Sequence, residues 1–182
     1  QAKHPGAVTV CYVNTTAAVK ALCDYCCTSD NALAMARHLL KTGRDIIFVP
    51  DRYLAGYISD QLGHPFIVWP GFCPTHARIL PEDIQKAKKD HPDAKVLVHP
   101  ECPPALTALA DCVASTEKMC KFVSDDPAGE FIIGTELGII HRMQKENPQK
   151  IFYPASGRAV CPNMKRITLE KILDRKSTRL NS

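Results

Sequence analysis

Short apolar runs alternate with longer amphipathic stretches along the whole chain. The short runs are rich in β-branched residues and are bounded by turn residues, which predicts buried strands at 8–13, 46–50, 66–70, 95–100 and 130–135. The longer stretches predict helices at 17–25, 31–43, 81–92, 102–112, 115–123 and 138–148, and Gly43 is suited to end the second of them. This alternation predicts an α/β fold with a mostly parallel sheet.

The chain also contains an internal repeat. Four short motifs recur in the same order, at offsets of 85 to 88 residues. We interpret them as two copies of a unit of about 87 residues. The alternative is that α/β units resemble one another by chance, which explains four ordered matches less well than a repeat does. The repeat predicts two similar three-layer α/β/α domains, at 1–81 and 82–173. The matched pairs are Tyr12-Val13-Asn14 with His99-Pro100-Glu101, 24–29 with 111–116, 49–51 with 134–136, and Cys73-Pro74 with Cys161-Pro162.

Composition and charge narrow the class of protein. The 182 residues are 45% hydrophobic and carry a net charge of +4, which is ordinary for a globular protein. Like charges nowhere form a block of five, so we expect no nucleic-acid partner, and no apolar run approaches the ~20 residues of a membrane span. The nine cysteines are odd in number and irregularly spaced, which favours a cytoplasmic protein with thiols that are free or bound to metal.

Two strand ends carry residues suited to chemistry. Tyr12 and Asn14 are two positions apart and therefore point to the same face, and His99 and Glu101 are related in the same way. A histidine and a glutamate that converge on one pocket are suited to proton transfer, and ligands of parallel sheets gather at the carboxyl ends of strands. The alternative is that these residues only form the turns that end two strands.

Hydroxyl residues precede two of the predicted helices. Ser29 lies before the helix at 31–43, and Ser115 and Thr116 begin the helix at 115–123. Hydroxyls and free N–H groups at a helix N-terminus bind carboxylates or phosphates, although simple N-capping is the commoner role. Their equivalent places in the two repeats favour a small anionic molecule held between the repeats.

Cys73 and Cys161 are the most interesting thiols. Both precede proline and occupy equivalent places, so a pseudo-rotation axis could bring them to one point, with two thiolates for a two-fold axis or three for a three-fold axis. His76, three positions after Cys73, is either a donor or substrate contact near a metal, or a surface histidine.

The other cysteines are less specific. The spacing Cys23-x₂-Cys26 makes that pair a zinc or redox candidate, but no second pair accompanies it. The alternative is that both are core thiols of a helical stretch, together with Cys27. The remaining thiols lie in or beside apolar runs and are interpreted as packing residues: Cys11, Cys102, Cys112 and Cys120.

These motifs, taken together, resemble the quinolinate synthase family, the iron–sulfur enzymes of NAD biosynthesis. The residues that carry the resemblance span most of the chain: YVNTTAAVKALCDYCCTSDNA (12–32), PDRYLAGYI (50–58), WPGFCPTH (69–76), VLVHPECP (96–103), AST (114–116), GTELGIIHRM (134–143) and CPNMKRITLEKI (161–172).

The resemblance implies three related α/β domains around a pseudo-three-fold axis, each giving one cysteine to a central [4Fe–4S] cluster. Cys73 and Cys161 match the second and third ligands, and the first belongs to a domain that this sequence lacks. Three ligands leave one iron open, and an open iron acts as a Lewis acid rather than as an electron carrier.

The resemblance also implies the reaction, in which iminoaspartate and dihydroxyacetone phosphate form quinolinate, phosphate and two waters. An aspartate-oxidising enzyme would be the functional partner. Glu101 is then the acid/base, with His99 and Tyr12 as further catalytic residues. The expected substrate contacts are Tyr12, Asn14, Ser29, His76, His99, Glu101, Ser115 and Thr116.

Two other classes of protein remain open. A non-catalytic module that binds a dicarboxylate would need Ser29, Thr116 and His99 but neither Cys73 nor Cys161. An electron-transfer iron–sulfur protein usually has a fourth cysteine near the others, and the sequence offers none.

The carboxyl end departs from the family pattern. Residues 174–182 read DRKSTRLNS, which is what a common sequencing-library adapter gives when translated in one frame. We therefore expect this segment to be a non-native tail, with a genuine polar tail as the alternative. Because the first domain is expected to be missing, we also expect the chain by itself to be inactive.

Overall fold

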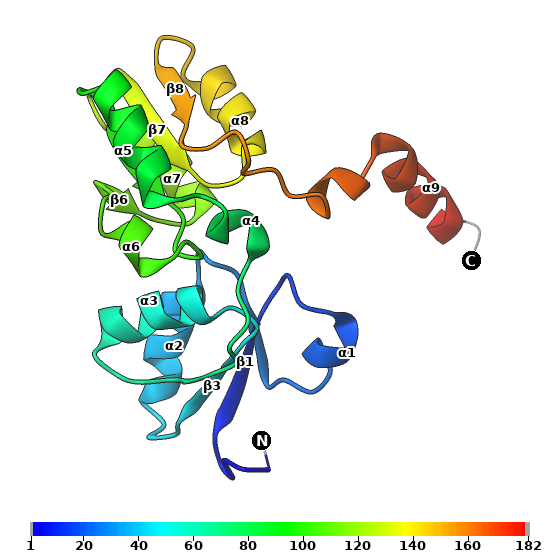
Figure 1. Cartoon of the computed structure of the whole chain (residues 1–182). Helices are drawn as coiled ribbons and strands as arrows, with labels where there is room; N and C mark the ends of the chain where they lie inside the picture. Colours follow the sequence, from blue (N-terminus) through cyan, green and yellow to red (C-terminus); the bar gives the residue numbers. More distant parts are fainter. Residues whose placement is uncertain (1, 181–182) are drawn as a thin grey trace.

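The chain folds around two parallel four-stranded sheets, one in each half of the molecule (Figure 1). The computed structural model describes residues 2–180, with side chains up to Arg175. The first sheet has the order β2-β1-β3-β4 and consists of β1 (Val8–Tyr12), β2 (Tyr25–Cys27), β3 (Ile46–Val49) and β4 (Ile67–Val68). The second has the order β6-β5-β7-β8 and consists of β5 (Lys95–Val98), β6 (Cys112–Val113), β7 (Glu130–Gly134) and β8 (Ile151–Pro154). These sheets confirm the predicted α/β fold.

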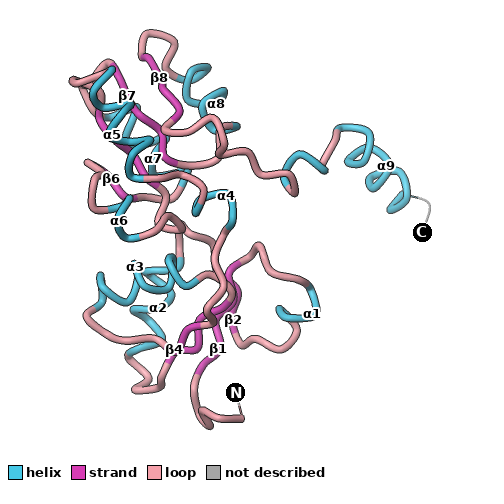
Figure 2. The backbone as a smooth tube through the Cα atoms, viewed as in Figure 1, coloured by secondary structure: helices cyan, strands magenta, loops and turns pink. Residues whose placement is uncertain are grey.

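Helices cover both sheets (Figure 2). On the first sheet, α2 (Ala32–Leu40) and α3 (Arg52–Leu62) pack together on one face and bury Leu39, Leu54 and Ile58 against the strands. The short helix α1 (Ala17–Lys20) lies on the opposite side of β1 (Figure 1). Asp51 caps α3, and Gly63 ends it with a φ of 60°, a conformation that glycine adopts without strain.

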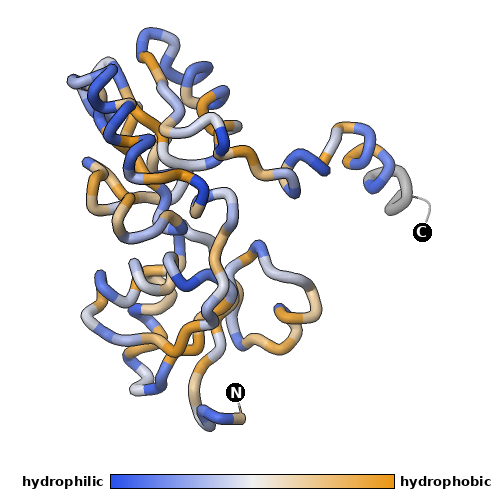
Figure 3. The backbone as a smooth tube through the Cα atoms, in the orientation of Figure 1, coloured by the Kyte–Doolittle hydropathy of each residue, from blue (hydrophilic) through white to orange (hydrophobic). Residues whose placement is uncertain are grey.

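The second sheet has a core on each face. Ile84 of α5 (Pro81–Asp90) and Leu106 of α6 (Pro104–Thr107) pack on one face of the sheet. Met119 of α7 (Thr116–Asp125) and Met143 of α8 (Gly138–Glu146) pack on the other. The hydrophobic residues follow the strands between these layers, whereas α5 is mostly hydrophilic (Figure 3).

The two sheets repeat the same local contacts, which gives the sequence repeat a physical basis. The Asp24 carboxylate accepts the Thr9 N–H at 2.8 Å, and the Asp111 carboxylate accepts the Val96 N–H at 2.7 Å. Both members of the second contact lie 87 positions after their counterparts. The predicted domain boundary near residue 81 stays a prediction; β4 ends at Val68 and β5 begins at Lys95.

Several elements differ from the sequence expectations. The segment predicted as one helix at 17–25 holds only α1 and then the first residue of β2, so residues 25–27 form a strand and not part of a helix. The helix predicted at 102–112 is likewise reduced to α6, and its last residue begins β6. No bounds had been predicted for α3 or β8, although each repeat unit was expected to hold a short strand after its first helix and a helix before its Cys-Pro, where β2 and α3 lie. The short strands form because β1, β5 and β7 supply hydrogen-bonding partners, which periodicity within the segments does not reveal.

The segment after β8 leaves the second sheet and runs away from it (Figure 1). It contains a 3₁₀ turn (Met164–Arg166) and α9 (Leu169–Leu180). The expected non-native tail falls on the second half of α9 and on residues 181–182, which lie outside the described residues. Among the described residues, no helix combines the length and the apolar character needed to cross a membrane.

Candidate active site and metal centre

A cavity of about 780 Å³ lies where the carboxyl ends of the two sheets meet. Helix α4 (Pro74–Ala77), in the connection between the sheets, contributes His76 to it. The first sheet contributes residues that follow β1 and β2, and the second contributes residues that follow β5, β6 and β7. Its lining residues from the strand ends include Tyr12, Asn14, Ser29, His99, Glu101, Thr116, Thr135 and Glu136.

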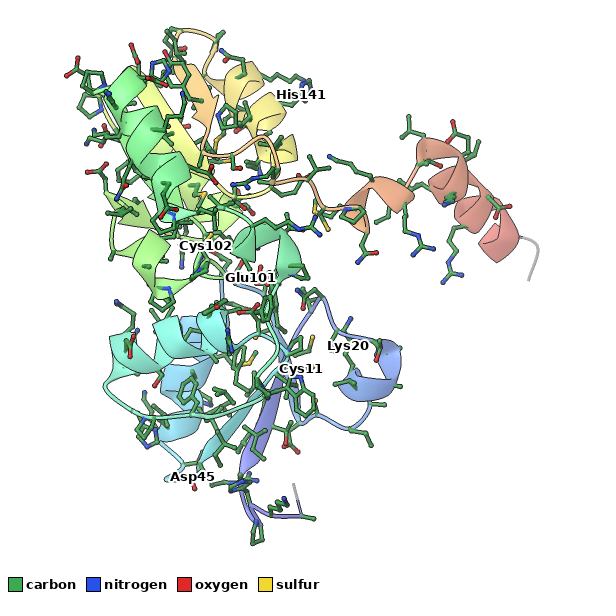
Figure 4. All side chains as sticks on the ribbon, viewed as in Figure 1. Cys11, Lys20, Asp45, Glu101, Cys102 and His141 are labelled. Carbon is green, nitrogen blue, oxygen red and sulfur yellow. The ribbon has the colours of Figure 1, made fainter. Side chains whose placement is uncertain are left out.

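Glu101 lies at the junction of the two sheets (Figure 4). Its side chain is buried, with 3% of the residue exposed. Tyr12 donates its hydroxyl to Glu101 Oε2 at 3.5 Å, and Asn14 donates its amide to Oε1 at 3.4 Å. The strand end of one repeat therefore hydrogen-bonds to the equivalent strand end of the other.

Two histidines stack beside this carboxyl group. The rings of His76 and His99 are 4.7 Å apart and nearly parallel, at 14°. Their Nδ1 atoms lie 3.6 Å and 3.4 Å from Glu101 Oε2. His99 Nδ1 also accepts the backbone N–H of Glu101 at 3.3 Å, whereas His76 Nε2 is 2.9 Å from the Thr135 hydroxyl.

Burial sets the protonation of all three groups. It lowers the pKa of His76 to about 4 and that of His99 to about 3. Burial also raises the pKa of Glu101 to about 8, and the Asp51 carboxylate nearby adds to this rise. At neutral pH the imidazoles are therefore neutral and Glu101 holds a proton, so their close approach is a set of polar contacts between neutral groups rather than two ion pairs.

The backbone N–H of each candidate ligand cysteine donates to a carboxylate, and the same carboxylate accepts N–H groups from the start of a helix. Asp51 Oδ2 accepts the Cys73 N–H at 2.8 Å, while Oδ1 accepts the N–H groups of Tyr53 and Leu54, in the first turn of α3, at 2.9 and 2.8 Å. Glu136 Oε1 accepts the Cys161 N–H at 3.3 Å, and Oε2 accepts the Gly138 N–H at 2.7 Å. We call Asp51 and Glu136 the cysteine-holding carboxylates. Unlike Asp51, Glu136 also forms a salt bridge with a lysine: Lys165 Nζ lies 3.2 Å from Glu136 Oε1.

The residues present fit a thiolate-bound metal group. Ligand atoms of Cys73, His76 and Glu101 lie within 4.8 Å of one another. His76, Glu101 and Cys161 line the cavity, whereas Cys73 is not among its lining residues. His76 Nδ1 is buried without a hydrogen-bond partner, which is costly unless a further group occupies the site. Burial raises the pKa of Cys73, so a bound metal would be needed to keep this thiol deprotonated at neutral pH.

The predicted anion-binding hydroxyls differ in position. Ser29 and Thr116 both line the cavity, and the Ser29 side chain lies near that of Tyr12. Ser115 is not among the lining residues. Its hydroxyl instead accepts the Lys118 N–H at the start of α7 and donates to the Asp30 carboxylate at 3.0 Å, which joins the two halves of the molecule.

Sequence reasoning missed several residues of the site. The cysteine-holding carboxylates occupy equivalent places in the repeat, so the argument applied to the strand ends at Asn14 and Glu101 would have found them. Arg142 and Lys165 also line the cavity. Lys165 comes from a loop without periodicity, and only its nearness to Cys161 in the sequence could have indicated it.

Comparisons with known proteins agree with the resemblance. The family model described as quinolinate synthetase A protein matches residues 1–179. A quinolinate synthase of Dehalococcoides mccartyi (strain CBDB1) is 50% identical over 173 residues, which cover 95% of this chain and 57% of the relative. Those of Methanoregula boonei and Thermodesulfovibrio yellowstonii are 50% and 52% identical, over 96% and 94% of this chain and 57% and 56% of the relatives. The chain thus spans little more than half the length of these curated relatives.

Proposed function

We propose that this chain, which belongs to the quinolinate synthetase A family, carries two of three domains of an enzyme that makes quinolinate. The whole enzyme would condense iminoaspartate with dihydroxyacetone phosphate. Quinolinate, one phosphate and two waters account for all atoms of the two substrates. Iminoaspartate would come from an enzyme that oxidises aspartate, and the thiol-rich composition favours the cytoplasm.

The observation that carries the proposal is the position of Glu101. This carboxyl group is buried beside two stacked, neutral imidazoles, accepts hydrogen bonds from Tyr12 and Asn14, and keeps its proton at neutral pH. An acid with a pKa of about 8 can both give and take a proton near pH 7. Isomerisation followed by loss of water requires a group that does both.

Other side chains around the cavity support binding of a molecule with several carboxylates. Thr116 begins α7 and Ser29 precedes α2, so hydroxyls and the positive ends of two helices face the cavity. His99 is a neutral hydrogen-bonding group beside Glu101 and lines the same cavity. These three residues would hold the carboxylates of iminoaspartate, and Tyr12 and Asn14 would orient the part of the substrate next to Glu101.

Cys73 and Cys161 would hold a [4Fe–4S] cluster together with a third cysteine outside this sequence. The cluster would supply a Lewis-acidic iron that polarises a substrate oxygen or nitrogen. In this proposal the cysteine-holding carboxylates fix the backbone of both ligands, and His76 lies beside the site through its contact with Thr135. Because one ligand is missing, we propose that the chain alone has neither a stable cluster nor activity.

Replacing Glu101 by glutamine in the full-length enzyme tests the proposal. Glutamine keeps the size and the acceptor for Asn14 but cannot transfer a proton. We expect turnover to fall by roughly 10² to 10⁴-fold while the cluster absorbance and the binding of a dicarboxylate analogue remain. Glu130→Gln is the matched control, because Glu130 accepts the Tyr153 hydroxyl of β8 at 3.2 Å and is not among the residues that line the cavity. Turnover of Glu101→Gln within a few-fold of the parent would refute the role of Glu101.

A further inference from the structure

A second group of thiols lies on the other face of β1, away from the cavity. Val8 and Val10 point into the core formed with α2 and α3, and Cys11, between Val10 and Tyr12, points to the side where α1 lies (Figure 4). Cys11 on β1 and Cys26 on β2 are directly paired in the sheet register. The Cys11 thiol lies near the thiols of Cys26 and Cys23 and donates to the Tyr25 carbonyl at 3.4 Å.

The three thiols differ in accessibility. Cys11 is fully buried, Cys23 is partly exposed and Cys26 is exposed. The exposure of Cys26 contradicts the expectation that the cysteines of this segment are core thiols, and only Cys27 of the segment is buried, on the core face. The reason is that residues 25–27 form an edge strand, so alternate side chains point to opposite faces.

A metal site fits this group poorly. Thiolates on one zinc lie about 3.8 Å apart, as follows from a zinc–sulfur distance of about 2.3 Å in a tetrahedron. Within residues 2–180, Cys73, His76 and Glu101 form the one set of three whose ligand atoms all lie within 4.8 Å of one another, so the three sulfur atoms here do not meet that spacing. Asp24, the nearest acidic residue in sequence, already accepts the Thr9 N–H.

We propose that Cys26 and Cys11 are a redox pair that forms a reversible disulfide in response to thiol oxidants of the disulfide class. Their Cα atoms face each other on neighbouring strands, which lie about 4.8 Å apart, within the usual ~4.4–6.8 Å for a disulfide. Cys23 is the less suited partner because it lies in the turn between α1 and β2, outside the register that pairs Cys26 with Cys11, and its thiol donates to the Val19 carbonyl at 3.2 Å.

The chemistry proceeds in two exchanges. The Cys26 thiolate attacks one sulfur of the oxidant, forms a mixed disulfide and expels one thiolate. The Cys11 sulfur then attacks Cys26 Sγ and expels the second thiolate. Two protein thiols lose two electrons and two protons, and the oxidant gains them as two thiols. Exposure makes Cys26 the first to react, and burial, which raises the pKa of Cys11 to about 12, makes the second exchange the slower one.

The bond would close a ring through the segment that carries Tyr12 and Asn14. Both residues line the cavity and contact Glu101, so oxidation would restrain one wall of the proposed active site. The pair is separate from Cys73 and Cys161, and its oxidation can be measured without activity.

Tryptic mapping of the full-length protein gives a direct test. Cleavage after Lys3, Lys20 and Arg37 places Cys11 alone on peptide 4–20, and Cys23, Cys26 and Cys27 on peptide 21–37. After treatment with glutathione disulfide and alkylation of the remaining thiols, we expect peptides 4–20 and 21–37 joined by a bond that a reductant breaks. A bond between Cys23 and Cys26 would instead leave peptide 21–37 unjoined.

Variants decide which thiols react. The joined peptides should disappear in Cys26→Ser, whose exposed position makes folding secure and checkable by circular dichroism. They should persist in the matched control Cys27→Ala, which changes the neighbouring cysteine on the core face. Joined peptides that survive in Cys26→Ser, a bond confined to peptide 21–37, or a glutathione adduct on Cys26 that never resolves would each overturn the proposal.

Discussion

Replacing Asp51 by asparagine should loosen Cys73 without loosening the helix that Asp51 caps. Asparagine keeps one oxygen for the two N–H groups of α3, and it caps helices as well as aspartate does. The second oxygen, which accepts the Cys73 N–H at 2.8 Å, becomes an NH₂ group. Two donors then face each other in a site where Asp51 is 2% exposed.

The size of the effect follows from this geometry. A buried N–H group left without an acceptor costs about 1–3 kcal/mol, which corresponds to local opening that is roughly 5 to 150 times more frequent. Hydrogen exchange of the full-length protein, read by NMR or by fragmentation mass spectrometry, should show this acceleration at the Cys73 amide. The amides of Tyr53 and Leu54 should keep their protection in Asp51→Asn and lose it in Asp51→Ala, where the cap is also gone.

A matched control comes from the second sheet. Asp126 also accepts a backbone N–H, that of Ala128 at 2.9 Å, but lies far from the cavity in the fold, so Asp126→Asn should leave the Cys73 amide unchanged. Unchanged exchange of the Cys73 amide in Asp51→Asn would refute the reasoning, and Asp51 would then be a helix cap only.

Three further changes have distinct outcomes. Cys161→Ser in the full-length enzyme should abolish the iron–sulfur absorbance, whereas Cys120→Ser, which changes a core thiol, should not. In the metal-free protein, the two buried histidines gain protons on unfolding below pH 6.5, which makes the melting temperature rise with pH up to about 6.5. Glu101 loses its proton on unfolding above pH 4.5, which makes the melting temperature fall from about pH 6.5 toward pH 8, where the histidines no longer compensate. Glu101→Gln should remove the fall, and a melting temperature that keeps rising between pH 6.5 and 8 in the parent would contradict the raised pKa. Gly71→Ala should lower the melting temperature by roughly 2–12 °C because the new Cβ would lie 2.5 Å from a backbone carbonyl oxygen, whereas Gly56→Ala, with nothing within 4 Å, should not lower it.

The long buried strands could be predicted with their bounds from the sequence, whereas the bounds of the short edge strands could not be predicted. The run at 46–50 is apolar and β-branched, and it forms β3 almost residue for residue. The residues of β2 lack such a run, since Tyr25 and Cys26 are exposed at the sheet edge and only pairing with β1 makes them a strand. Helix α3 did carry signals, Asp51 before it and Gly63 after it, but its apolar pattern is weak.

The residues of the candidate site could be predicted where they lie in the repeated motifs. The family resemblance implied that Asn14 and Glu101 contact the same substrate, and in the structure Asn14 Nδ2 lies 3.4 Å from Glu101 Oε1. The stacking of His76 on His99 depends instead on the path of the connection between the sheets, which no periodicity encodes. The same holds for Lys165, whose contribution comes from a loop that follows the last strand.

Two equivalent strand ends, one from each copy of the repeat, meet in this cavity. A site built in this way can have a different function in each copy. Had the copies stayed identical, the cavity would present the same side chain twice, and two equal groups would compete for one role. Here Asn14 and Glu101 occupy corresponding positions, so one copy supplies an uncharged donor and the other a group that holds and releases a proton. Divergence at corresponding positions of a duplicated unit thereby turns a symmetrical scaffold into an asymmetrical one, in which Asn14 of one copy hydrogen-bonds to the group that titrates in the other.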